Sequence, residues 1–168
     1  MTLSRVYDLV VSTINGGGNI PIGELPLGLQ GGGGIEALYS IRTGRYAIYG
    51  FIGGGVTIGI NTGSAGVQGT LGYVFGTPDS QSYTQLFTTL SVPYLALPPD
   101  LRTLVDLHAP KLSGTNVNIF FDPNGGGSCG ISFARSLVES EFASPNYSLT
   151  ISYYWQLWPR HNEVVPFR

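Results

Sequence analysis

Two carboxylates and a thiol are the side chains whose type and spacing could support chemistry in this sequence. Glu139 and Glu141 would share a face if residues 136–142 are extended, and two carboxyl groups about 5 Å apart can hydrolyse glycosides. Two glutamates without a cleft do not make an active site. A charged strand edge that discourages association of one sheet with another is the favoured interpretation.

Cys129 and His108 are the other candidates for catalysis. A papain-type cysteine needs a histidine far downstream, whereas only 39 residues follow Cys129. Cys129 lies in a predicted strand, which favours a buried structural thiol. His108 lies at the apolar edge of a short predicted helix, where a structural histidine is commoner than a base. We therefore predict that the protein is not an enzyme.

Metal and cofactor sites also lack a sequence signal. The chain has one cysteine and two histidines, with no zinc-like spacing. Glycine clusters can hold phosphate, but a phosphate loop follows a strand, opens a helix and usually carries a lysine. None of the four clusters here has that context, so we expect turns or strand bends and no cofactor. The clusters are Gly16–Gly18, Gly31–Gly34, Gly53–Gly55 and Gly125–Gly127.

Scarcity of charge is the strongest compositional signal. Charged residues make up 11% of the chain, against about 25% in an average soluble domain. The formal net charge is −2 and the eight basic residues are scattered, which argues against nucleic acid as a partner. A surface so poor in charge suits contact with an apolar ligand, a glycan, a membrane, a host protein or further copies of the chain.

Alternation of apolar and other residues with a period of two predicts a nearly all-β domain. The predicted strands cover residues 37–42, 45–50, 56–60, 67–75, 86–92, 117–121, 129–133 and 147–155. A two-residue turn at Thr43-Gly44 would set Ile41 opposite Tyr46. A short helix is predicted between Pro98 and Pro110. Residues 159–168 show no period and are expected to form an irregular strap.

Single glycines inside these strands favour a barrel. Gly59, Gly69 and Gly72 alternate with large side chains, and glycine within a strand marks sharp curvature or the close approach of another backbone. The predicted fold is therefore a small antiparallel β-barrel with one short helix in a loop, and a tight β-sandwich is the alternative. Residues 1–168 are expected to form a single domain.

Two groups of side chains are candidate contact sites. On alternation alone, the predicted lining of the barrel interior is a ligand-binding set formed by Ile58, Leu71, Tyr73, Leu149 and Ile151. A second, aromatic set could contact a membrane or a glycan. It comprises Tyr153, Tyr154, Trp155 and Trp158.

Several stretches resemble the glycine-rich β domains found near the ends of large bacterial surface or RHS-type toxin proteins. The stretches are Gly33-Gly34-Ile35-Glu36-Ala37-Leu38-Tyr39 through the Thr43-Gly44 turn to Gly72-Tyr73-Val74-Phe75, Ser144-Pro145-Asn146-Tyr147 and Ser152-Tyr153-Tyr154-Trp155. The resemblance implies an extracellular or cell-surface setting and carries over no site residues. The first eight residues do not form a secretory signal, because Asp8 interrupts a short apolar run.

Three functions are compatible with these observations. The leading hypothesis is a non-enzymatic binding or interaction module of a bacterial surface or toxin-associated system, with a lipid, a glycan or a host protein as its partner. The second is a membrane-inserting or pore-forming β protein, because strands with alternating hydrophobicity and aromatic ends are typical of membrane barrels. The third is a structural subunit whose charge-poor surface drives homo-oligomerisation.

Overall fold

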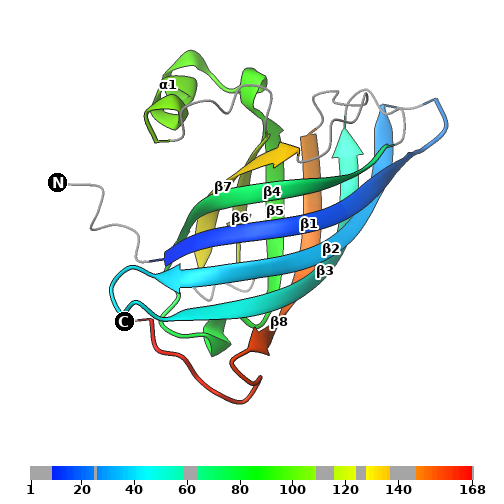
Figure 1. Cartoon of the computed structure of the whole chain (residues 1–168). Helices are drawn as coiled ribbons and strands as arrows, with labels where there is room; N and C mark the ends of the chain where they lie inside the picture. The colour runs from blue at the N-terminus through cyan, green and yellow to red at the C-terminus, as the bar shows by residue number, and fades with distance from the viewer. Residues whose placement is uncertain are drawn as a thin grey trace.

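The strands of the protein close into one eight-stranded antiparallel barrel (Figure 1). The computed structural model describes residues 9–24, 26–58, 64–108, 116–123, 128–136 and 147–167. Around the barrel the order is β1-β2-β3-β8-β5-β6-β7-β4. The prediction of an all-β fold built as a small antiparallel barrel is confirmed.

Five of the strands are long and three are short. The elements are β1 (Leu9–Pro21), β2 (Leu27–Ser40), β3 (Tyr46–Ile58), β4 (Ser64–Phe75), η2 (Gln81–Tyr83), β5 (Leu86–Pro93), η3 (Tyr94–Ala96), α1 (Pro99–His108), β6 (Asn116–Phe121), β7 (Cys129–Ser136) and β8 (Tyr147–Trp158). The helix predicted after Pro98 is α1, which lies in the connection between β5 and β6. His108 is its last residue.

The strand order divides the barrel into two Greek keys. In each unit three consecutive strands pair in sequence and the fourth returns beside the first, giving β4-β1-β2-β3 and then β8-β5-β6-β7. The units join where β3 pairs with β8 and β4 pairs with β7. An up-and-down barrel would pair β3 with β4 instead. The β4–β5 connection therefore crosses one end of the barrel, where it carries η2.

The β2–β3 hairpin forms with a longer turn than the sequence predicts. Tyr39 pairs with Tyr46, so the predicted pairing of Ile41 with Tyr46 is wrong by two residues. The turn is held by hydrogen bonds from the Gly44 N–H to the Ser40 carbonyl and from the Thr43 N–H to Ser40 Oγ. Gly44 has φ of 68°, which favours glycine. A shift of two residues keeps each side chain on its predicted face.

Three glycine clusters lie inside strands, so of the two expectations, turns and strand bends, the structure has the strand bends. Gly17 pairs with Gly32, and Gly32 pairs with Gly53 across β1, β2 and β3. A Cβ atom on Gly17 would lie 2.8 Å from the Gly31 carbonyl oxygen, and one on Gly53 would lie 2.6 Å from that of Ile151. The barrel wall is so sharply bent there that side chains do not fit. Gly125–Gly127 and Gly59 lie outside the described residues.

Gly72 confirms the prediction that single strand glycines mark a close backbone approach. A Cβ atom at this position of β4 would overlap the Ile131 carbonyl oxygen and the Ser132 side chain of β7. Gly72 pairs with Ser132 at the boundary between the two Greek keys. The absence of a side chain therefore lets the two units close on each other.

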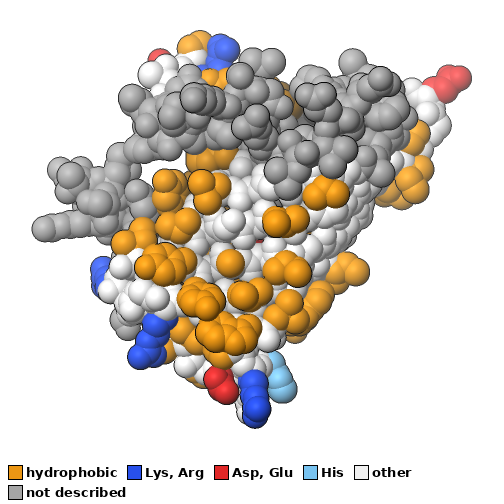
Figure 2. Space-filling model, viewed as in Figure 1, with side chains coloured by type: hydrophobic (Ala, Val, Ile, Leu, Met, Phe, Trp, Pro, Cys, Tyr) orange, Lys and Arg blue, Asp and Glu red, His pale blue; other side chains and the backbone are white. Residues whose placement is uncertain are grey.

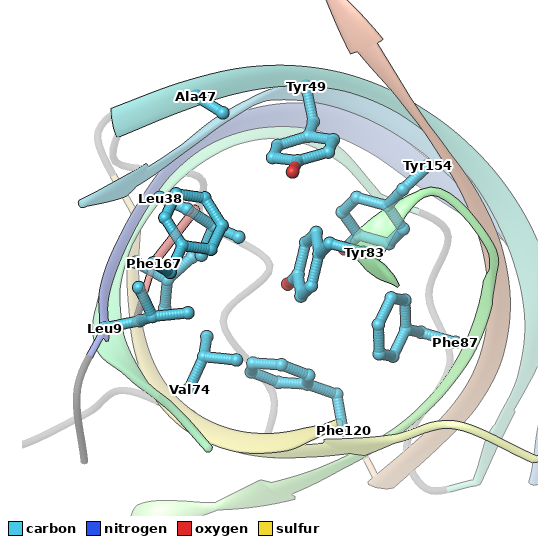
Figure 3. Close-up of a cluster of buried hydrophobic side chains, with 11 residues drawn as sticks. Leu9, Leu38, Ala47, Tyr49, Val74, Tyr83, Phe87, Phe120, Tyr154 and Phe167 are labelled. Atoms are coloured by element: carbon cyan, nitrogen blue, oxygen red, sulfur yellow. The ribbon is translucent and has the colours of Figure 1, made fainter. Parts of the chain in front are cut away.

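Aromatic side chains fill the interior toward the end of the barrel where β8 ends. Figure 3 shows Tyr49, Tyr83, Phe87 and Tyr154 pointing toward one another inside the ring of strands. Their rings lie 4.6 to 5.4 Å apart in edge or tilted contacts, which aromatic pairs favour. This cluster is the hydrophobic core, and it occupies the space that a conduit through the barrel would need.

Residues 159–167 form a strap that closes the same end. Phe167 is fully buried within the core. Its N–H donates to the Pro78 carbonyl at 2.9 Å, and its carbonyl accepts from Ser40 Oγ at 2.9 Å. The Val165 N–H donates to Ser80 Oγ at 2.8 Å. These bonds tie the strap to the β2–β3 turn and to the β4–β5 connection.

Candidate functional site

The strands place many large apolar residues outside the barrel, while their hydroxyl residues and Glu36 share the interior with the aromatic core. In β8, Leu149, Ile151 and Tyr153 face outward and are exposed. The alternating positions Ser148, Thr150, Ser152, Tyr154 and Gln156 face the interior. Strand alternation alone produces two such faces, and the closed barrel decides which of them meets the surroundings.

Large exposed hydrophobic side chains form what we call the apolar belt. They come from seven strands, and β7 adds the exposed Cys129. Figure 2 shows one face of the barrel largely covered by apolar side chains, with charged ones toward its ends. The belt comprises Ile14, Ile20, Leu29, Ile35, Ile52, Val56, Ile58, Leu71, Leu86, Leu90, Ile119, Phe121, Leu149 and Ile151, each at least 39% exposed.

Charge is nearly absent from the strands. Their sequences contain only Glu36 and Arg135 as charged residues, and Glu36 points into the barrel, where it is 4% exposed. Charged residues of the described connections, helix and strap lie beyond the strands, and they include Glu24, Arg42, Arg45, Asp79, Asp100, Arg102, Asp122, Arg160 and Glu163. The described charges thus gather at the two ends of the barrel.

Glu36 is held inside the barrel by hydroxyl groups. Thr13 Oγ1 donates to one carboxylate oxygen at 3.0 Å, and the Tyr83 hydroxyl donates to the other at 2.5 Å. Burial raises the pKa of Tyr83 well above its usual value, so this hydroxyl remains a donor. Burial also raises the pKa of Glu36 to about 7, against the opposing effect of these hydrogen bonds. A buried, hydrogen-bonded carboxyl group beneath an exterior of large apolar side chains departs from the usual arrangement of a water-soluble domain.

Aromatic rings gather at the outer edge of the belt near the strap. Tyr46 and Trp158 stack with ring centroids 4.8 Å apart, and Tyr153 and Trp155 stack at 6.4 Å. Trp155 covers the bare backbone of Gly50, where a Cβ atom would lie 2.7 Å from the indole ring. This covering of a strand glycine by an aromatic ring stabilises sheets.

The predicted aromatic set is divided between the two faces. Tyr153, Trp155 and Trp158 are exposed, whereas Tyr154 points inward and packs on Phe51 at 4.9 Å. The prediction that Tyr154 belongs to a contact surface is therefore wrong. Tyr46 belongs to this surface and was not predicted, because its partner Trp158 is more than a hundred residues away in sequence.

The predicted lining of the interior faces outward. Ile58, Leu71, Leu149 and Ile151 are exposed, and Tyr73 lies on the same outer side of β4 as Leu71. The expectation that this set lines a ligand cavity is wrong in its placement, because a period of two gives two faces without saying which is inner. The opposite face of β8 is rich in hydroxyl residues, and this was the sequence signal that could have identified the inner face.

The remaining sequence candidates do not form a site in the described residues. Cys129 is exposed on β7, so the prediction of a buried thiol is wrong, and Glu139 and Glu141 lie outside the described residues. No cluster of three potential metal ligands occurs within the described part of the chain. Among the described residues, no helix combines the length and the apolar character that a membrane span needs.

The apolar belt is hollowed at one place by small side chains. Ser12 pairs with Ala37, and Ala37 pairs with Ile48, across β1, β2 and β3. Beside them the larger pair Ile14 and Ile35 forms a wall. The resulting groove has a volume of about 470 Å³ and an almost wholly apolar lining.

Comparison with known proteins gives no relative for this chain. No protein-family model matches it, and no curated protein or solved structure is significantly similar to it. The functional argument therefore rests on the barrel itself.

Proposed function

We propose that this protein is a non-enzymatic β-barrel that inserts into a lipid bilayer. The observation that carries the proposal is the uncharged apolar belt around the barrel, with the buried carboxylate of Glu36 inside it. Membrane barrels have an outward apolar band, aromatic residues at its edges and polar residues inside. The belt, the Tyr46–Trp158 stack and the inward hydroxyl residues match these three features.

The long strands have the length that a bilayer requires. Strands β1, β2, β3, β4 and β8 contain 12 to 14 residues. At about 3.3 Å per residue and a tilt of about 40°, such strands span roughly 30 Å, which equals the hydrocarbon core of a typical bilayer. Closure of the barrel satisfies the backbone hydrogen bonds that lipid could not.

The short strands also carry apolar residues on their outer side, and some of these are covered. Beyond the exposed Ile119 of β6, Val117 and Phe133 pair on the same outer side. They are covered by Tyr94 of η3 and by Leu97. The outer side of these strands, which contain 6 to 8 residues, is thus apolar along their paired length.

Lipid fits this surface better than a protein partner does. A partner or a second copy would cover one side of the barrel, whereas exposed belt residues occur on seven strands around its circumference. An apolar surface that encircles a protein needs an apolar solvent. The filled core and the strap favour a closed membrane barrel over an open pore.

The bacterial surface or toxin-associated setting stays a prediction from the sequence resemblance. A membrane barrel is compatible with that setting, and its groove and aromatic edge are candidate places for lipid contact. Binding of a glycan or a host protein has no support from the described geometry beyond the exposed aromatic rings.

Vesicle flotation of the full chain tests the proposal. We expect the purified protein, refolded from urea with phosphatidylcholine vesicles, to float with them and to remain after a carbonate wash. Failure to float with vesicles of any composition, together with a monodisperse soluble particle, would refute membrane insertion.

A matched pair of variants locates the contact in the belt. Ile151→Arg places a charge in the belt, and Val164→Arg makes a similar change in the strap; the two side chains are 55% and 51% exposed. A charge on the lipid face of a membrane barrel costs about 2–4 kcal/mol at the midplane. We expect the first variant to lose most flotation and the second to retain it. Equal behaviour would contradict the assignment of the belt to lipid.

A further inference from the structure

Two strands that line the groove, β2 and β3, meet at the one hairpin turn with two arginines among the described residues. Along β2, Ala37 of the groove is followed by Tyr39 and then by Arg42 in the turn. Along β3, Ile48 of the groove is preceded by Tyr46 and Arg45. The three residues from Ile48 to Arg45 correspond to about 10 Å of extended chain. Both strands therefore run from the apolar groove, past Tyr39 and Tyr46, to the turn that carries the two arginines.

The two connections that flank β2 carry charges of opposite sign. Arg42 and Arg45 are exposed in the turn between β2 and β3. The opposite ends of β1 and β2 meet at the connection that carries Glu24, which is also exposed. A molecule with its apolar chain in the groove and an anionic head would place that head at the arginines, because they follow the groove residues along both strands.

We infer that the groove and the β2–β3 turn form a binding site for a membrane phospholipid with an anionic headgroup. One acyl chain lies in the groove against Ile14, Ile35 and Ile48, and the phosphate-bearing head lies against the guanidinium groups of Arg42 and Arg45. Guanidinium groups bind phosphate through paired hydrogen bonds. Tyr39 and Tyr46 lie at the level between them, where aromatic rings favour the membrane interface. This inference rests on the proposed insertion into lipid.

The headgroup contact is tested by comparing vesicles of phosphatidylcholine with vesicles that also contain phosphatidylglycerol. Each arginine near an anionic surface contributes about fivefold to binding, so Arg42→Gln with Arg45→Gln should lose about 25-fold of the preference for phosphatidylglycerol. The charge-preserving double variant Arg42→Lys with Arg45→Lys should retain most of it. Raising the salt concentration should weaken the preference of the wild type.

The groove is tested by lipid retention in native mass spectrometry of the detergent-solubilised protein. We expect the wild type to retain one phosphatidylglycerol molecule. Ser12→Leu with Ala37→Leu should fill the groove and abolish retention. Thr88→Leu adds an apolar side chain to the outer side of β5, away from the groove, and should leave retention unchanged.

The possible results separate this inference from the proposed function. Flotation with both vesicle types at equal affinity, unaltered by the glutamine variants, would overturn the lipid site while membrane insertion stands. Flotation with neither type would overturn both. Retention of phosphatidylglycerol by the groove-filled variant would also overturn the site. Loss of preference in the glutamine variants, retention in the lysine variants and loss of bound lipid in the groove-filled variant would support it.

Discussion

The two Greek keys form one barrel but differ in composition, since one is rich in glycine and the other in inward-facing aromatic residues. Strands β1 to β4 carry a glycine at many positions, including inward-facing Gly17, Gly53 and Gly72, whereas β5, β6 and β8 contain none. The second unit instead sends Phe87, Phe120 and Tyr154 into the interior. The glycine-rich unit supplies a wall that bends sharply, and the aromatic unit supplies much of the volume that fills it. A small barrel needs both.

Removing an aromatic ring of the second unit should have the largest effect. Phe87→Ala deletes a side chain that is 1% exposed and contacts three other rings, and we expect a loss of about 4 kcal/mol in the free energy of unfolding. Urea unfolding in detergent micelles measures it. Phe121→Ala removes a ring that is 42% exposed on the outer face, so a loss as large as that at Phe87 would contradict the division into core and belt.

Adding a methyl group to the glycine-rich wall should come next. Gly53→Ala places a Cβ atom against the backbone of Ile151 and the hydroxyl of Ser152, and overpacking of this kind costs about 3 kcal/mol. The matched control is Gly66→Ala in β4, whose Cβ would meet nothing within 4 Å. Thermal unfolding of both variants gives the difference. Equal melting temperatures would show that the wall relaxes and that its glycines are not required by packing.

The hydrogen bond between the β4–β5 connection and β2 should have the smallest effect. Tyr83→Phe removes the hydroxyl that donates to buried Glu36 of β2 and leaves the carboxylate with fewer donors, which costs about 2 kcal/mol. The variant Tyr83→Phe combined with Glu36→Gln should recover part of the loss, because a neutral amide needs less compensation. Without that recovery in urea unfolding, the bond does not stabilise the attachment of the connection to β2.

The fold could be predicted from local pattern, while the strand order could not. Alternation in β8 and the turn residues Thr43-Gly44 are local signals for antiparallel strands, and single strand glycines such as Gly72 favoured the barrel. The pairing of β3 with β8 depends on contacts such as Ile52 with Tyr153, which no local pattern encodes. Gly16–Gly18 and the glycines that pair with it were not predicted as strand, because glycine clusters are typical of turns. Their role in a bent wall is visible only when the three strands are aligned.

The candidate site was predicted in its residues and missed in its orientation. Leu71, Leu149 and Ile151 were identified as one face of their strands, and they are one face. Placing them inside followed from the usual burial of apolar residues. Glu36 lies on the opposite face of β2 from Ile35, which was a signal against that choice. The signal could be interpreted only once the barrel was known to close.

The position of Phe167 bears on how the chain is made. Ser40 hydrogen-bonds to Phe167, which lies 127 residues later in sequence. The separation between β3 and its partner β8 is nearly as large. During synthesis, at about 5–20 residues per second, the first four strands thus emerge with an apolar outer face and an unfinished inner face. Contacts this distant slow folding and prolong exposure to aggregation. We expect the nascent first unit to need a chaperone or a membrane surface before the second unit is complete.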